Sequence, residues 1–78
     1  MTLNIISAQQ ILFTGEVRSV TLPGTMGSFT VLHDHASLIS TLTPGKVVYV
    51  DNDGVAHDTG IEGGIVSVDN NIISVCVA

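Results

Sequence analysis

The residues TLPGTMGSFTVLHDHASLISTLTPG, from Thr21 to Gly45, decide how the rest of the sequence is interpreted. They include both prolines of the chain and two of its three histidines, and apolar, strand-like runs flank them on both sides. Pro23-Gly24 and Pro44-Gly45 are turn signals, because proline presets φ and glycine tolerates positive φ. The stretch therefore predicts short extended segments separated by turns, and it contains no recognisable catalytic set.

Strand-like runs continue along the whole chain. The apolar fraction is 45% and the aromatic fraction only 4%, so Val, Ile and Leu must build the core, and β-branched side chains favour strands. The runs are Leu3–Ser7, Ile11–Phe13, Val17–Leu22, Ser28–Leu32, Leu38–Leu42, Lys46–Val50, Val55–Ile61, Ile65–Val68 and Ile72–Val77. We expect a single all-β domain over residues 1–78, a flattened antiparallel β-sandwich or barrel of about ten short strands.

Local signals predict where these strands turn or bend. Asp51–Gly54 is the strongest hairpin signal, because Asn, Asp and Gly tolerate positive φ, and Asp69–Asn71 predicts a second hairpin. Gly63-Gly64 permits a tight turn or a close approach of two backbones. Thr14–Glu16 interrupts an apolar run, and the broken alternation around Arg18-Ser19 predicts a bulge.

Charge and composition exclude several classes of protein. The net charge is −5, and Arg18 and Lys46 are the only certain cations, which argues against binding to nucleic acid or to an anionic lipid surface. The N-terminus lacks the features of a signal peptide, and no apolar stretch approaches the roughly 20 residues of a membrane span. Cys76 is alone, so we expect a buried small hydrophobe rather than a disulfide. These features predict a soluble intracellular protein or part of a larger assembly.

The three histidines are the residues with the best chance of forming a reactive site. His33 and His35 share one face if they lie on a strand, and His57 could join them, but a catalytic zinc needs about three protein ligands and nothing places the third. A small metal-binding β-barrel enzyme that uses His33, His35 and His57 is therefore the alternative function. Ser37 and Ser40 lie near a histidine, but neither a nucleophile elbow nor an oxyanion hole is signalled.

A pair of glycines and three apolar residues are further candidates for a functional site. Gly24 and Gly27 lack the lysine and the following helix that a phosphate-binding loop needs, so a plain loop is the better interpretation. Met26, Leu38 and Ile39 lie in or beside turn signals, where they either complete the core or form an exposed surface that contacts another protein.

An ordered set of short motifs extends over nearly the whole chain. It comprises Phe13-x-Gly15-Glu16-Val17, Val20-x-Leu22-Pro23-Gly24-x-x-Gly27-x-Phe29, His35-Ala36, Leu38, Leu42-x-Pro44-Gly45 and Gly63-Gly64-x-Val66-x-Val68. Each motif is weak alone, but the set in this order is specific. It resembles the epsilon subunit of F-type ATP synthases, which is called delta in mitochondria.

The resemblance implies a ten-stranded flattened β-sandwich at the foot of the central stalk. In this family the domain contacts the gamma subunit on one side and the c-ring loops on another, helps to couple proton transport to ATP synthesis, and has no catalytic residues. The chain would then be a non-catalytic rotor subunit without a cofactor, monomeric within the complex. It would be peripheral, on the cytoplasmic side of the bacterial inner membrane.

Matching positions carry two sets of contact residues over to this chain. The resemblance implies a gamma-facing set of Ser7, His35, Leu38, Ile39 and Ser40. It implies a c-ring-facing set of Thr25, Met26, Gly27 and Ser28. Family members usually continue into a C-terminal helical hairpin that can inhibit ATP hydrolysis and, in some bacteria, bind ATP. Because this sequence ends at Ala78, we expect neither property of it, and it also has Ser37 where the family commonly has proline.

Overall fold

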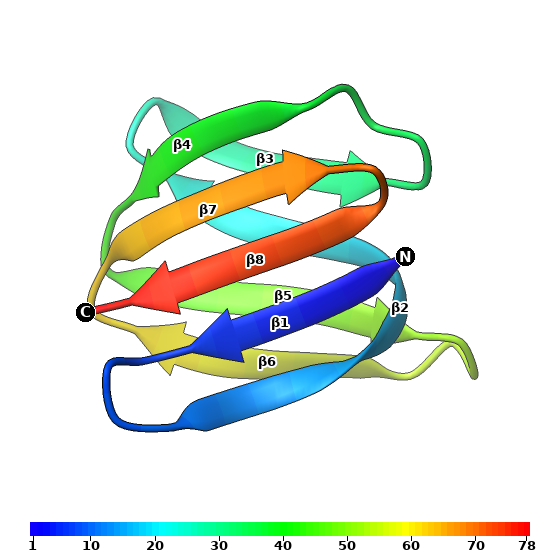
Figure 1. Cartoon of the computed structure of the whole chain (residues 1–78), viewed down its shortest axis with the longest axis horizontal. Helices are drawn as coiled ribbons and strands as arrows, with labels where there is room; N and C mark the ends of the chain where they lie inside the picture. Colours follow the sequence, from blue (N-terminus) through cyan, green and yellow to red (C-terminus); the bar gives the residue numbers. More distant parts are fainter.

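Eight β-strands and no helix make up the computed structural model, which describes all 78 residues (Figure 1). In chain order they are β1 (Thr2–Ile6), β2 (Ile11–Gly24), β3 (Gly27–Leu32), β4 (Leu38–Leu42), β5 (Gly45–Asp51), β6 (Ala56–Ile61), β7 (Gly64–Asp69) and β8 (Ile72–Val77). The prediction of an all-β fold is confirmed. The chain has no helix that is both long and apolar enough to cross a membrane.

The strands form two layers that share β2 (Figure 1). In the view of the figure, the front layer consists of β4, β7, β8, β1 and the first part of β2. The back layer consists of β3, the second part of β2, β5 and β6. The pairing of β2 with β5 shifts register between Val17 and Ser19, which confirms the predicted bulge. The β1–β8 pair is parallel and all other pairs are antiparallel, so the sandwich is not antiparallel throughout.

The core between the layers is almost entirely aliphatic. Fourteen buried residues form one cluster: Leu3, Ile5, Val17, Val20, Leu22, Val31, Leu42, Val47, Tyr49, Ile61, Val66, Val68, Ile73 and Val75. Burying each Val, Leu or Ile side chain contributes about 1.5–3 kcal/mol relative to leaving it exposed. Because neighbouring residues of a strand face opposite sides, this inward set determines which residues lie on the two outer faces.

The strand count is eight rather than about ten, and two of the nine predicted runs form a single strand. Ile11–Phe13 and Val17–Leu22 belong to the 14-residue β2, and Thr14–Glu16 does not interrupt it. These three residues stay paired with β1, and the ring of Phe13 folds over Gly15. The prediction of a break was wrong because alternation with polar residues is compatible with an extended strand that has one solvent-facing side.

The turn predicted at Pro23-Gly24 lies two residues later in the structure. Both residues stay in β2, where Gly24 pairs with Gly27, and the chain reverses at the two residues Thr25 and Met26. The hairpin predicted at Asp51–Gly54 is present, with Gly54 at a φ of 83°. The second predicted hairpin, at Asp69–Asn71, joins β7 to β8.

Close backbone approach explains one of the paired glycines, as predicted. A Cβ on Gly64 would lie 2.1 Å from the carbonyl oxygen of Cys76 on β8. Cys76 itself was expected to be buried, but it is exposed. Ile73 and Val75 face the core from the same strand, so alternation places the side chain of Cys76 on the opposite, outer side.

Candidate docking surfaces

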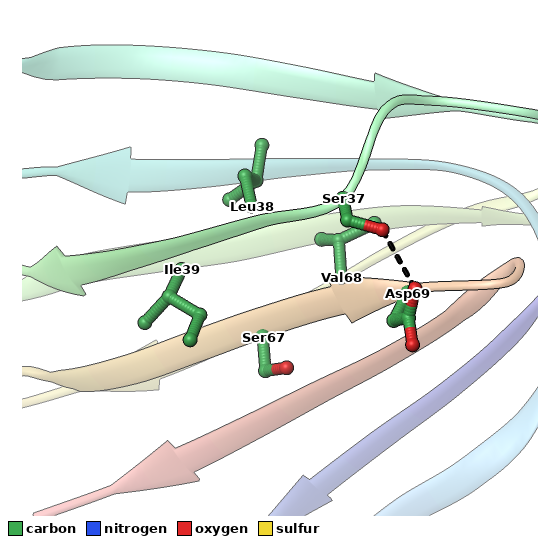
Figure 2. Close-up of a pocket in the computed structure, with 6 residues that line it drawn as sticks. All are labelled: Ser37, Leu38, Ile39, Ser67, Val68 and Asp69. Atoms are coloured by element: carbon green, nitrogen blue, oxygen red, sulfur yellow. Dashed lines mark hydrogen bonds between the residues drawn. The ribbon is translucent and has the colours of Figure 1, made fainter.

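Neighbouring residues at the start of β4 point to opposite sides of the sheet. Leu38 packs against the core, whereas the side chain of Ile39 is 78% exposed, and Figure 2 shows the two pointing apart. Ser40 alternates back to the side of Leu38, and its hydroxyl donates to the carbonyl of Thr41. Of the three β4 residues in the gamma-facing set, only Ile39 therefore offers a large apolar side chain to a partner.

The gamma-facing set as a whole does not form one patch. Leu38–Ser40 are consecutive on β4, and His35 lies in the loop before them. Ser7 instead follows β1, which is separated from β4 by β7 and β8 in the front layer (Figure 1). It lines a shallow depression with Cys76 and Val77. A second shallow depression, of about 510 Å³, lies over β4 and β7 and includes Ile39 (Figure 2).

An apolar row that the sequence analysis missed crosses the outer face of the front layer. Strand register places its members side by side on four strands, in the order Ile65, Cys76, Ile6 and Ile11. We call these four residues the front apolar row. Ile11 is 69% exposed and Ile65 is 50% exposed. The alternation in β7, where Val66 and Val68 face inward, is the signal that could have placed Ile65 outside.

The c-ring-facing set forms the turn between β2 and β3. Met26 lies at its tip and is 98% exposed, so it is surface rather than core. Gly27 and Ser28, at the start of β3, are exposed as well. The backbone N–H of Thr25 donates to the carbonyl of Thr41 over 3.1 Å, and the two threonine hydroxyls share a hydrogen bond of 2.8 Å. The turn is therefore attached to the end of β4.

The three histidines lie in two separate parts of the molecule. His33 and His35 are in the β3–β4 loop, where the Nδ1 of His33 lies 3.1 Å from the carboxylate of Asp34. His57 is on β6, and its ring stacks on that of Tyr49 with centroids 5.3 Å apart. No group of three or more His, Cys, Asp or Glu side chains lies close enough together to hold a metal ion. The geometry therefore does not support the alternative of a metal site built from the three histidines.

Two aspartates have perturbed acidities. The side-chain amide of Asn71 donates to Asp34 and lowers the pKa of that carboxyl, and the nearby His33 lowers it further. The ring of His57 is the largest cause of the lowered pKa of Asp51, followed by the backbone N–H of Val55. Asp34 is exposed and Asp51 is partly buried, and both carboxylates accept hydrogen bonds that hold turns in shape.

Comparison with known proteins agrees with this geometry. The family model for the β-sandwich domain of the ATP synthase delta/epsilon chain matches residues 1–78. The ATP synthase epsilon chain of Bordetella petrii is 36% identical over 75 residues, which cover 96% of this chain and 53% of that protein. The epsilon chain of Wolinella succinogenes is 41% identical over 69 residues, 88% of this chain and 53% of that protein. The chain thus spans about half the length of these relatives.

A solved structure supports the fold independently. One chain in the mitochondrial ATP synthase of Euglena gracilis, determined as OSCP/F1/c-ring, superposes with a TM-score of 0.89. That match covers 96% of this chain and 48% of the other at 21% sequence identity, so it shows a shared fold. Together with the family match over all 78 residues, it confirms the resemblance found in the sequence. The chain belongs to the family of β-sandwich domains from the delta and epsilon chains of ATP synthase.

Proposed function

We propose that this chain is a non-catalytic domain of the rotor of an F-type ATP synthase, peripheral to the membrane on its cytoplasmic side. It docks on the gamma subunit through Ile39 and the front apolar row, and on the c-ring loops through the Thr25–Ser28 turn. In this position it helps to couple proton transport to ATP synthesis. Family membership supports the rotor assignment, and the exposed apolar residues of the front layer support the docking.

The observation that carries the gamma contact is the exposure of Ile39. An isoleucine that is 78% exposed contributes nothing to the core of this domain. It lies on β4 beside β7, the strand that carries Ile65 of the front apolar row. Exposed apolar patches of this kind mark protein–protein contacts in soluble proteins. A buried isoleucine at an interface contributes about 1.5–3 kcal/mol, which is enough to decide whether a moderate complex forms.

Strand β4 links the two proposed docking surfaces. Ile39 lies near its start, and Thr41, two residues later on the same outer side, bonds to Thr25 of the turn. The backbone N–H of Thr43 also donates to the carbonyl of Pro23 over 2.8 Å, which fixes the end of β4 against β2. A rigid, hydrogen-bonded connection of this length suits a subunit that must hold two partners in a constant relative position.

Co-purification with the gamma subunit tests the proposal. The chain is co-expressed with gamma, and Ile39→Asp is compared with Leu32→Asp. Leu32 is a suitable control because it is 57% exposed on β3 in the back layer, so the same charge is added to a different face. We expect Ile39→Asp to weaken gamma binding at least about tenfold, because a carboxylate would be desolvated without a partner, and Leu32→Asp to bind like the parent.

The same design separates the two surfaces. Met26→Asp should leave gamma binding unchanged and reduce the recovery of the c-ring with the gamma-bound complex. Equal gamma binding by the parent and Ile39→Asp would contradict the assignment of this face. Failure of the folded parent to bind gamma at all would contradict the proposed function.

A further inference from the structure

The β3–β4 loop, His33–Ser37, is hydrogen-bonded at two points to the turn between β7 and β8, near the C-terminal end of the sequence. Asp34 and Asn71 exchange two hydrogen bonds: the backbone N–H of Asp34 donates to Oδ1 of Asn71 over 2.7 Å, and Nδ2 of Asn71 donates to Oδ1 of Asp34 over 3.0 Å. Farther along, the hydroxyl of Ser37 donates to Oδ1 of Asp69 over 2.6 Å (Figure 2). These three hydrogen bonds join residues more than thirty positions apart in the sequence.

The backbone conformations of Asp34 and Asn71 suit residues of these two types. Asp34 has a φ of 62° and Asn71 a φ of 60°, the left-handed region in which Asp and Asn are the commonest residues after glycine. Asn71 is itself held, since its carbonyl accepts a 2.9 Å hydrogen bond from the N–H of Thr2 in β1. The loop is thus attached to a turn that is already part of the front layer.

The attached loop leads directly into the surface proposed to meet gamma. The loop carries His35 and ends at Leu38, the first residue of β4, and Ile39 follows. Apart from the two ties, the loop makes few internal bonds: the N–H of His35 donates to the carbonyl of Leu32 over 3.1 Å, and the ring of His35 bonds to the carbonyl of Ala36. Most of its shape therefore depends on the contacts with Asn71 and Asp69.

We propose that Asn71 and Asp69 are positioning residues that hold the β3–β4 loop in its docking shape before a partner arrives. The identity of that partner, the gamma subunit, rests on the proposed function. The order of the loop is a property of the free chain and does not depend on the partner. A loop ordered in advance binds more tightly, because the entropy of ordering is not lost at the moment of association. Asn71 and Asp69 would then affect gamma binding without contacting gamma.

The groups around Asp34 give this arrangement a spectroscopic signature. His33 contacts the other carboxylate oxygen of Asp34 over 3.1 Å, while Asp69 bonds to Ser37 and His35 to Ala36. Because the amide of Asn71 is the largest cause of the lowered pKa of Asp34, removing that amide should raise this pKa toward the ordinary value of about 3.9. A side chain that acted only by filling space would not shift this titration.

The first test uses the free chain and four variants at position 34, 37 or 71. Asn71→Gly keeps the left-handed backbone and removes the amide, and Ser37→Ala removes the second tie. Asp34→Asn keeps both hydrogen bonds, since an amide oxygen can still accept from Asn71. Asn71→Asp keeps the size of the side chain but sets a carboxylate against that of Asp34, and like charges at this distance repel.

Backbone ¹⁵N relaxation gives the readout. In the parent and in Asp34→Asn, loop order parameters should stay near the value of a rigid backbone, about 0.85. In Asn71→Gly they should fall below about 0.6, and adding Ser37→Ala should lower them further. Asn71→Asp should be mobile at neutral pH and become ordered on acidification, when the two carboxyl groups share a proton. An ordered loop in Asn71→Gly, with Asp34 titrating as in the parent, would overturn the proposal.

Gamma binding gives the second readout. We expect Asn71→Gly to bind gamma about three- to tenfold more weakly and Asp34→Asn, which keeps both hydrogen bonds, to bind like the parent. A loop that becomes mobile in Asn71→Gly without any loss of gamma affinity would overturn the positioning role. A parent that fails to bind gamma refutes the proposed function instead, and the relaxation result then still decides whether the two ties order the loop.

Discussion

The β3–β4 loop and the β5–β6 hairpin each contain an aspartate in contact with a histidine, but the hydrogen bonds of the two aspartates reach different distances along the chain. Asp51 accepts hydrogen bonds from the N–H groups of Asp53 and Val55 and from the ring of His57, all within six residues. Asp34 bonds to Asn71, which is 37 residues away. The bonds of Asp51 are therefore local, and the hairpin is joined to β2 by a hydrogen bond of 2.6 Å from the guanidinium of Arg18 to the carbonyl of Asn52. The bonds of Asp34, in contrast, form only when the front layer has assembled.

This difference decides how a disturbance spreads. A change at Asp51 breaks bonds between residues that are neighbours in sequence, so we expect its effect to stay within the hairpin and Arg18, which bonds to Asn52. A change under the β3–β4 loop disturbs the β7–β8 turn together with β4, which carries Ile39 of the surface proposed to meet gamma. The segments of a protein that unfold locally often coincide with structural units such as these.

The largest effect is expected where the non-local loop enters β4. Leu38→Asp places a carboxylate against the core and should lower the free energy of unfolding by about 2–4 kcal/mol. Ile39→Asp, one residue later, faces solvent and should change it by less than about 0.5 kcal/mol. Urea denaturation followed by circular dichroism measures both. Equal destabilisation by the two variants would mean that β4 does not alternate as described.

The next largest effect is expected at the tip of the hairpin. Gly54 has a φ of 83°, and a Cβ there meets only the guanidinium of Arg18 at 3.6 Å, so backbone strain rather than crowding opposes substitution. Gly54→Ala should cost about 1–2 kcal/mol. Because the bonds of Asp51 are local and the hairpin tip is also held by Arg18, amide exchange should accelerate only between residues 51 and 57 and around Arg18. Faster exchange in the β3–β4 loop as well would show that the two regions are coupled.

Acid should weaken both regions through their aspartates. The folded chain lowers the pKa of Asp34 and of Asp51, so each ionised carboxylate stabilises the fold. This contribution is complete above the unfolded pKa of about 3.9 and is lost as the pH falls through the lower folded pKa. Denaturation from about pH 6 to pH 2 should show stability falling in acid, and Asp34→Asn and Asp51→Asn should each flatten that dependence.

A background variant distinguishes the two contributions. In Asn71→Gly the part of the acid-dependent stability that comes from Asp34 should shrink, because the main partner of Asp34 is gone. The part that comes from Asp51 should persist. An unchanged acid dependence in Asn71→Gly would show that the bond between Asp34 and Asn71 contributes nothing to the stability of the fold.

The same division between local and distant bonds explains what the sequence could predict. The hairpin at Asp51–Gly54 was predicted because its signals lie within a few residues of one another. The order of turns and the alternation of Ile73 and Val75 were equally local, and they were enough for the all-β fold. Expecting a break at Thr14–Glu16 was wrong, since only the pairing of that segment with β1 shows that the strand continues.

The proposed docking surfaces were only partly accessible to sequence reasoning. The sequence left open whether Met26, Leu38 and Ile39 lie on the surface or in the core. Their exposed fractions in the structure place Met26 and Ile39 on the surface, and Leu38 packs against the core. The front apolar row was missed because its members come from four strands whose order in the sheet cannot be read from a single sequence. The pairing of Asp34 with Asn71 has no sequence signal for the same reason.

The smallest effect is expected at His57, where two contacts can be removed separately. Its Nε2 lies 2.8 Å from a carboxylate oxygen of Asp51, and its ring stacks on Tyr49, which in turn packs on Phe13 with centroids 4.5 Å apart. His57→Phe keeps the stacking and removes the bond to Asp51, whereas His57→Gln keeps a donor and removes the stacking. Because the site is exposed, each variant should lower Tm by less than about 4 °C. His57→Phe should also raise the pKa of Asp51, since the ring is the largest cause of its low value, and should leave Asp34 unaffected. A carboxyl titration by NMR that shows both aspartates shifting in His57→Phe would mean that the hairpin and the loop are not independent.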